Sequence, residues 1–179
     1  MDIFSHSILQ SMSFSDMCVR LLMAAFLGLV LGLEREAMSK PAGLRTHMLV
    51  SLAASAFTIT GEEVALTVQV PGASPDPVRI IEVVTAGAAF LGTATIIQGR
   101  GRIEGITTGA SIWLVAALGV ACGTGAYALA GVACAIGFLI LYPLRYLENR
   151  LGMNVGPKAG ARAKGEKEAA PDHEAESRD

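Results

Sequence analysis

Charge is scarce in this chain, and a long stretch of its C-terminal half carries none. Asp, Glu, Lys and Arg make up 17% of the 179 residues, whereas 52% are hydrophobic. Together with a mean hydropathy of +0.50, these proportions exclude an average water-soluble domain. The formal net charge of -2 leaves no excess of Lys and Arg for a phosphate backbone. We therefore expect no nucleic-acid partner.

The motifs that carry catalysis or bind zinc are also missing. Cys18, Cys122 and Cys134 lie in apolar runs without CxxC spacing or a nearby histidine, so we interpret them as small core residues. The sequence contains no HExxH motif and no nucleophile with a basic partner in its own span, and residues 99–102 lack the Lys-Ser/Thr pair of a phosphate loop. We expect no enzyme activity, no catalytic residue and no bound cofactor.

Apolar segments of membrane-spanning length dominate the rest of the chain. A helix that crosses a bilayer needs roughly 20 mostly apolar residues. Three such segments cover residues 17–33, 44–60 and 80–98, and a fourth, uncharged stretch covers 106–144. The fourth is too long for one span, and Gly123-Thr124-Gly125 is a natural place for a reversal. The sequence therefore predicts an all-α integral membrane bundle of about five transmembrane helices.

Basic residues set the expected orientation. The connections between spans alternate between few and several Lys and Arg residues, and positive loops stay in the cytoplasm. This pattern predicts an extracytoplasmic N-terminus at 1–16, a membrane domain at 17–150 and a cytoplasmic segment at 151–179. From Gly156 onwards the chain has no aromatic or β-branched residue. That composition predicts a disordered, charged tail.

Charges of the predicted membrane domain gather at the helix ends. Glu34, Arg35 and Glu36 close the first span and Arg45 opens the second, so we expect them to meet at the cytoplasmic face. An ion pair of Arg45 with Glu34 and Glu36 would fix the first two helices there. The alternative is that these are ordinary interfacial charges that reach towards water.

A second charged group opens the third predicted helix. Asp76, Arg79 and Glu82 are spaced three apart and would share one face, with Asp76 as the helix cap and a local ion pair beside it. The alternative is a functional outer site. Hard divalent cations prefer carboxylate oxygens, so Asp76 and Glu82 are candidate metal ligands.

Glycines one helical turn apart predict close helix packing. Such pairs admit a neighbouring backbone within a membrane bundle. The pairs are Gly28 with Gly32, Gly105 with Gly109, and Gly119 with Gly123.

Several strings resemble the MgtC/SapB family of bacterial membrane proteins. They are LGLERE at 31–36, PAGLRTH at 41–47, DPVRI at 76–80, FLG at 90–92 and GITTGASIW at 105–113, in the family's order. Longer members carry a folded soluble domain after the last helix, where this chain has the charged tail. The family's motif residues, carried over position by position, are Glu34, Arg35, Glu36, Gly43, Arg45, Thr46, Asp76, Arg79, Gly92, Thr107, Thr108, Ser111 and Trp113.

This resemblance implies a multi-pass protein of the bacterial inner membrane. Its role would be in magnesium homeostasis, growth under magnesium limitation and, in pathogens, virulence; no cofactor is implied beyond this link to magnesium. The leading hypothesis is a non-enzymatic protein that contacts membrane partners, such as ATP synthase or a second copy of itself, within the lipid bilayer. Direct transport of magnesium or another divalent cation is the alternative. Thr107 and Thr108 would cap the fourth helix on the same face as Glu34 and Arg45, forming one inner-face site.

Overall fold

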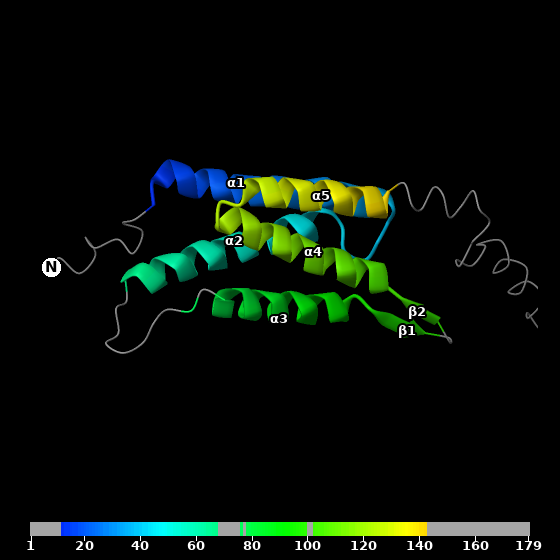
Figure 1. Ribbon diagram of the computed structural model, residues 1–179. Coiled ribbons are helices and arrows are strands. Elements are labelled where there is room, and N and C mark those ends of the chain that lie inside the picture. Colours follow the sequence, from blue (N-terminus) through cyan, green and yellow to red (C-terminus); the bar gives the residue numbers. More distant parts are fainter. Residues whose placement is uncertain (1–11, 68–75, 77, 100–101, 143–179) are drawn as a thin grey trace, which may run out of the picture. The chain divides into compact units, whose positions relative to one another are not determined.

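The computed structural model describes residues 12–67, 76, 78–99 and 102–142 (Figure 1). The described helices are α1 (Phe14–Ala37), α2 (Leu44–Thr67), α3 (Val78–Ala94), α4 (Ile106–Gly123) and α5 (Tyr127–Leu141). A short antiparallel hairpin of β1 (Ile97–Gly99) and β2 (Arg102–Glu104) joins α3 to α4. The predicted tail at 151–179 and most of the predicted N-terminal segment at 1–16 lie outside the described residues.

The first two helices are longer than the hydropathy pattern predicts. α1 continues through Glu34 and Arg35 because both side chains turn into the protein and are buried. α2 was expected to end at residues 61–63, yet it runs on through them. There Glu63 is only 2% exposed, and a Cβ at Gly61 would collide with the side chain of Ile80 on α3. Tertiary packing therefore extends both helices past their charged residues.

The third helix is shorter than predicted. We expected it to reach residue 98, but α3 ends at Ala94 and Ile97–Gly99 pairs with β2 instead. The hydroxyl of Thr95 donates to the carbonyl of Gly92 at 2.7 Å and so satisfies a carbonyl of the last turn. The β-branched residues Ile96 and Ile97 that follow favour the extended conformation of β1.

The predicted reversal between the last two helices is confirmed. Gly125 has φ +78°, the left-handed conformation that ends many helices. Its N–H donates to Cys122 O at 3.0 Å, and the N–H of Ala126 donates to Ala121 O at 2.8 Å. These two bonds form a Schellman motif, which closes α4 and starts α5 back along it.

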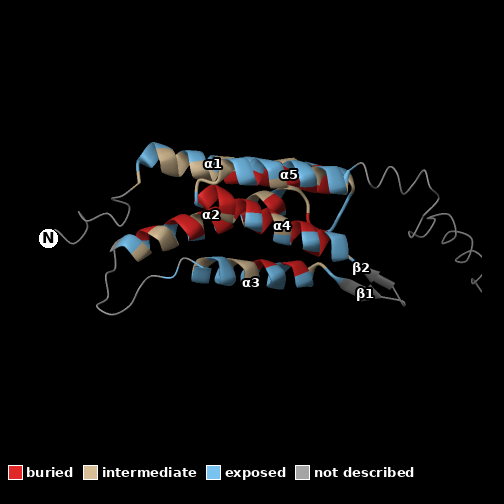
Figure 2. Ribbon diagram, in the orientation of Figure 1, coloured by how far each residue is buried: buried red, intermediate tan, exposed pale blue. Residues whose placement is uncertain are grey.

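Helix α4 lies at the centre of the bundle and contacts each of the other four helices (Figure 1). Figure 2 shows the buried residues concentrated on it. The core of α1, α4 and α5 includes Leu31, Val115, Leu118 and Cys122, all at most 1% exposed. Cys122 and Cys134 are free, buried core residues, as the sequence predicted, whereas the prediction was wrong for Cys18, which is only partly buried.

Within the described residues, three helices are long and apolar enough to cross a membrane. They are α1, α2 over Leu44–Leu66, and α4, whereas α3 and α5 have 17 and 15 residues. The expected all-helical bundle is thus observed apart from the hairpin. The number of five spans stays a prediction.

Two of the three predicted glycine pairs pack helices together. A Cβ at Gly28 or Gly32 would collide with the backbone of α2, and so would one at Gly119. The third pair was wrong, because Gly105 precedes α4 with φ +93°, while Gly109 faces Gly92 of α3 instead. A Cβ at Gly92 would lie 3.0 Å from Gly109 O.

Candidate functional site

A group of buried polar side chains lies where the end of α1 meets the first turns of α2 and α4. We call Glu34, Arg35, His47, Thr108 and Ser111 the buried polar cluster, and each of these residues is at most 5% exposed. The α1–α2 turn and the β1–β2 hairpin lie at this same end of the bundle, which we call the hairpin end (Figure 1). Buried polar groups cost free energy unless they are hydrogen-bonded, so their partners decide what the cluster does.

His47 links α2 to α4. Its Nδ1 lies 2.9 Å from the carbonyl oxygen of Gly43, and its Nε2 lies 3.0 Å from Ser111 Oγ. A carbonyl oxygen only accepts hydrogen bonds, so Nδ1 carries a hydrogen and donates it. Ser111 Oγ is also 2.8 Å from the carbonyl oxygen of Thr108.

The serine hydroxyl has one hydrogen and two acceptors within reach. It donates either to Thr108 O or to Nε2 of His47. All three hydrogen bonds form together only when His47 carries a proton on both ring nitrogens. The charges of Arg35 and Glu34 both act on this ring. The hydrogen bonds of His47 and Ser111 therefore join α2 to α4, and the charged pair at the end of α1 acts on them only through its charges.

Glu34 and Arg35 form a buried ion pair between neighbouring residues of α1. Arg35 Nε donates to Glu34 Oε2, and the two side chains are 1% and 3% exposed. Glu34 Oε1 and Arg35 Nη1 are also buried and have no hydrogen-bond partner within the described chain. Burying two charges costs free energy, and removal of either partner would leave the other charge buried without an opposite charge.

The expected ion pair between Arg45 and the acids of α1 does not form. Arg45 is exposed and makes no ion pair with any described residue. Glu34 is already bound to Arg35, and Glu36 serves as a cap, because its Oε2 accepts the N–H of Leu44 at 3.1 Å. Gly43 leaves room for this cap, since a Cβ there would displace the Glu36 carboxylate.

The start of α4 also differs from the expected arrangement. The residue before the helix is Gly105, and no side chain caps it, so the prediction that Thr107 and Thr108 cap α4 was wrong. Thr108 is buried, whereas Thr107 is exposed. Trp113 is 54% exposed and lies outside the cluster. Of the α4 motif residues, the structure brings Thr108 and Ser111 into the site.

At the opposite end of the bundle, Asp76 caps α3 as predicted. Its Oδ1 accepts the N–H of Val78 at 3.0 Å. The expected local ion pair with Arg79 or Glu82 is not formed, and all three residues are exposed. Within residues 12–67, 76, 78–99 and 102–142, no group of three or more His, Cys, Asp or Glu side chains is placed to hold a metal ion.

Sequence reasoning missed two structural residues, His47 and Arg20. Arg20 lies at the end of the bundle opposite the cluster, and Figure 1 shows α1 beginning there. Its guanidinium contacts Asp16 at 3.0 Å, Glu62 at 3.3 Å and the carbonyl oxygen of Gly123. The spacing of polar residues on α2 could have identified His47, because it lies four residues before Ser51 and therefore on the same buried face of the helix.

Ser111→Ala should destabilise the protein because it leaves Nε2 of His47 buried without a partner. We expect a loss of about 1–3 kcal/mol in the free energy of unfolding, measured by thermal unfolding of the purified protein in detergent. Ser51→Ala is the matched control, since Ser51 Oγ is buried and has no partner to lose in the described chain. Equal effects of the two substitutions would show that the His47–Ser111 bond contributes nothing.

Comparison with known proteins places these features in a family. The sequence model of the MgtC family matches residues 21–150. YhiD of Escherichia coli K12, named as a candidate magnesium transporter, is 33% identical over 138 residues, which cover 76% of this chain and 64% of YhiD. SrpB of Synechococcus elongatus is 37% identical over 123 residues, 62% of this chain and 64% of SrpB.

A third relative, MgtC of Salmonella typhimurium LT2, is 36% identical over 110 residues, 61% of this chain and 44% of MgtC. The chain thus spans less than two thirds of the length of each of these three relatives. No solved structure matches the chain. Its apolar helices, and a family match that covers most of the chain, show that this membrane protein belongs to the MgtC family.

Proposed function

We propose that this protein acts in magnesium homeostasis through contacts with membrane partners, and that it is not an enzyme. The observation that supports the proposal is a set of motif residues whose side chains do not stabilise the fold. Arg45 and Thr46 on α2 and Thr107 on α4 are exposed at the hairpin end, and none has a side-chain partner in the described chain. Polar side chains without an internal role are available to a partner such as ATP synthase or a second copy of this chain.

The buried polar cluster supports the same proposal because it positions the exposed motif residues. Its residues are at most 5% exposed, and the bond between His47 and Ser111 joins α2 to α4. Such a cluster fixes the relative positions of helix ends. It would therefore hold the exposed residues of α2 and α4 in one arrangement for recognition.

We infer that α3 and α5 cross the bilayer together with α1, α2 and α4, with the hairpin end in the cytoplasm of an inner membrane. The connections at that end carry Lys40 and Arg102. Arg35 and Arg45 also lie at that end, so it has four basic residues in the described chain, against Arg20 and Arg79 at the opposite end. This asymmetry favours an outer N-terminus, because basic residues stay on the cytoplasmic side.

A second candidate function is direct transport of magnesium or another divalent cation. The observation that favours it is the similarity to YhiD, whose name describes such a transporter. Liposomes that contain the purified protein and a magnesium-sensitive dye would separate the two functions. Protein-dependent flux that falls in Asp76→Ala would support transport. Absence of flux, together with a membrane partner crosslinked at position 45, would support the partner proposal.

Arg45→Ala should abolish support for growth in low magnesium while leaving the amount of membrane-inserted protein unchanged. The guanidinium stabilises nothing inside the described fold, so its loss acts on external contacts. Growth is compared in cells that lack their own copy of the gene and express each variant at an equal level. Lys40→Ala is the control, because Lys40 is an exposed cation in the connection just before α2 but lies between the motif strings. Wild-type growth with Arg45→Ala would reject a functional role for this side chain.

A further inference from the structure

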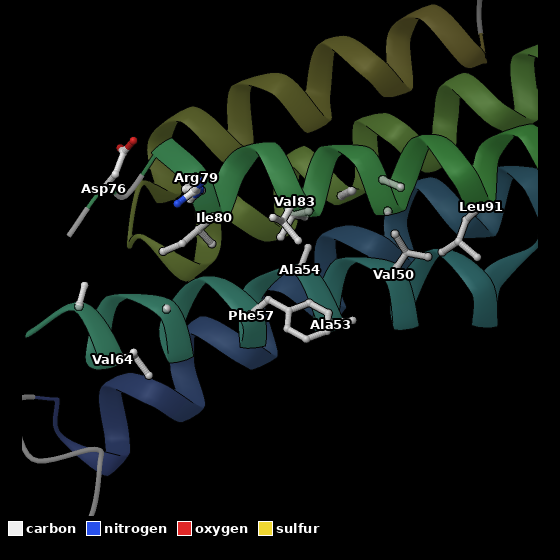
Figure 3. A pocket seen from close by; sticks show the side chains of 16 residues that line it. Val50, Ala53, Ala54, Phe57, Val64, Asp76, Arg79, Ile80, Val83 and Leu91 are labelled. Atoms are coloured by element: carbon white, nitrogen blue, oxygen red, sulfur yellow. The ribbon is translucent and has the colours of Figure 1, made fainter. Parts of the chain in front are cut away.

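An apolar groove lies between α2 and α3 (Figure 3). It has a volume of about 760 Å³, and small side chains form much of its wall, including Ala53, Ala54 and Ala88. A Cβ at Gly87 would meet nothing within 4 Å, so the space beside this glycine is open. The groove exists because α3 packs mainly against α4 and only lightly against α2.

Two opposite charges mark one end of this groove. Asp76 and Arg79 are its only charged lining residues among the described part of the chain, and Figure 3 shows them together at the start of α3. Arg79 is exposed and has no ion-pair partner among those residues. Asp76 uses Oδ1 to cap Val78, which leaves its second carboxylate oxygen for another donor.

The length of the groove is close to the hydrocarbon thickness of one leaflet of the bilayer. The α3 residues that line it run from Arg79 to Leu91, which corresponds to about 18 Å at 1.5 Å per helical residue. One leaflet contributes about 15 Å of hydrocarbon, half of a core of about 30 Å. A chain that starts at Arg79 therefore ends near the bilayer centre.

The groove is long and narrow. Its volume of about 760 Å³, spread over about 18 Å, gives a mean cross-section of about 42 Å². A flexible hydrocarbon chain can follow such a groove without any movement of the helices.

We propose that the α2–α3 groove binds an acyl chain of an aminophospholipid whose phosphate lies on Arg79 and whose primary ammonium lies on Asp76. A guanidinium binds phosphate through parallel charge-assisted hydrogen bonds, and a primary ammonium donates to a carboxylate. The adjacent charges of Arg79 and Asp76 match the two adjacent charges of this headgroup. An anionic headgroup without the ammonium would meet Asp76 unpaired.

Native mass spectrometry of the full chain in detergent tests this proposal with three lipids that share the same acyl chains. Phosphatidylethanolamine should be retained about tenfold more strongly than phosphatidylcholine, because the quaternary ammonium of phosphatidylcholine cannot donate a hydrogen bond to Asp76. Phosphatidylglycerol should also bind about tenfold more weakly, since it lacks the cation. Equal retention of the three lipids, or a preference for phosphatidylglycerol, would overturn the proposal.

Matched variants locate the bound lipid. Gly87→Leu fills the groove, whereas Gly131→Leu adds the same side chain at a position on α5 that also has nothing within 4 Å of its Cβ. Phosphatidylethanolamine binding should fall about tenfold in Gly87→Leu and in Arg79→Gln, and stay at the wild-type level in Gly131→Leu. Arg79→Gln keeps the test decisive if Gly87→Leu does not fold. Wild-type binding by Arg79→Gln, or equal binding by the two leucine variants, would show that the lipid lies elsewhere.

Discussion

Gly28→Ala is expected to lower the free energy of unfolding by about 1–3 kcal/mol, although it adds one methyl group. An ideal Cβ at Gly28 lies 2.7 Å from His47 O and 2.9 Å from Met48 Cα, both atoms of the α2 backbone. A backbone cannot rotate away as a side chain can, so α1 and α2 must separate. The displaced backbone belongs to His47, and the substitution should therefore strain the His47–Ser111 bond as well.

The matched control for this prediction is Gly131→Ala on α5. Nothing lies within 4 Å of a Cβ at this position. Alanine is also the better helix former by about 1 kcal/mol, so the control should leave stability unchanged or raise it. Thermal unfolding of both variants in one detergent gives the comparison. A Gly28→Ala protein as stable as Gly131→Ala would mean that α1 and α2 do not approach each other this closely.

Hydropathy and glycine placement were sufficient to predict much of the bundle. The uncharged stretch at 106–144 had to contain a reversal because it is too long for one span, and Gly123-Thr124-Gly125 offered the only short glycine pair near its middle. The end of α3 was not predictable in this way. Hydropathy continues through Ile96 and Ile97, while the pairing of residues 97–99 with 102–104 depends on a strand partner that hydropathy cannot indicate.

The sequence correctly predicted that the charged ends of α1 and α2 lie together, but it paired the wrong residues. Charge complementarity alone suggested Arg45 as the partner of Glu34, whereas helix phase decides which charges face inwards. Arg35 follows Ala24, Gly28 and Leu31 on the buried face of α1. It is therefore the arginine that meets Glu34 inside the protein.

The spacing of polar residues along α2 also indicates its buried face, which composition alone does not show. His47, Ser51, Ser55 and Thr58 recur at spacings of four, four and three, and all are at most 2% exposed. This polar face packs against Gly119 and the other small residues of the neighbouring helices. Polar residues on the packed side of a membrane helix are typical of interhelical contacts, so this pattern could have identified His47 from the sequence.

Arg20→Met is expected to lower the free energy of unfolding by about 1–3 kcal/mol, because it removes a cation that binds two carboxylates and a helix-end carbonyl at once. The side chain of Arg20 is 17% exposed and contacts Asp16, Glu62 and the carbonyl oxygen of Gly123. That carbonyl lies at the C-terminus of α4, where the helix dipole favours a cation. Arg20 thereby ties the start of α1 to the ends of α2 and α4.

Arg20→Lys should recover only part of this loss. A lysine keeps the charge, but its compact ammonium lacks the planar fork that reaches acceptors on three sides. Arg45→Met is the matched control, since Arg45 is exposed and without an ion pair in the described chain. Its substitution should change stability by less than about 0.5 kcal/mol. Thermal unfolding in one detergent ranks the four proteins. Combining Arg20→Met with Glu62→Gln should cost less than the sum of the single substitutions, because both remove the same contact. Additive losses, or a loss from Arg20→Met no larger than that from Arg45→Met, would show that Arg20 does not hold the helix ends together.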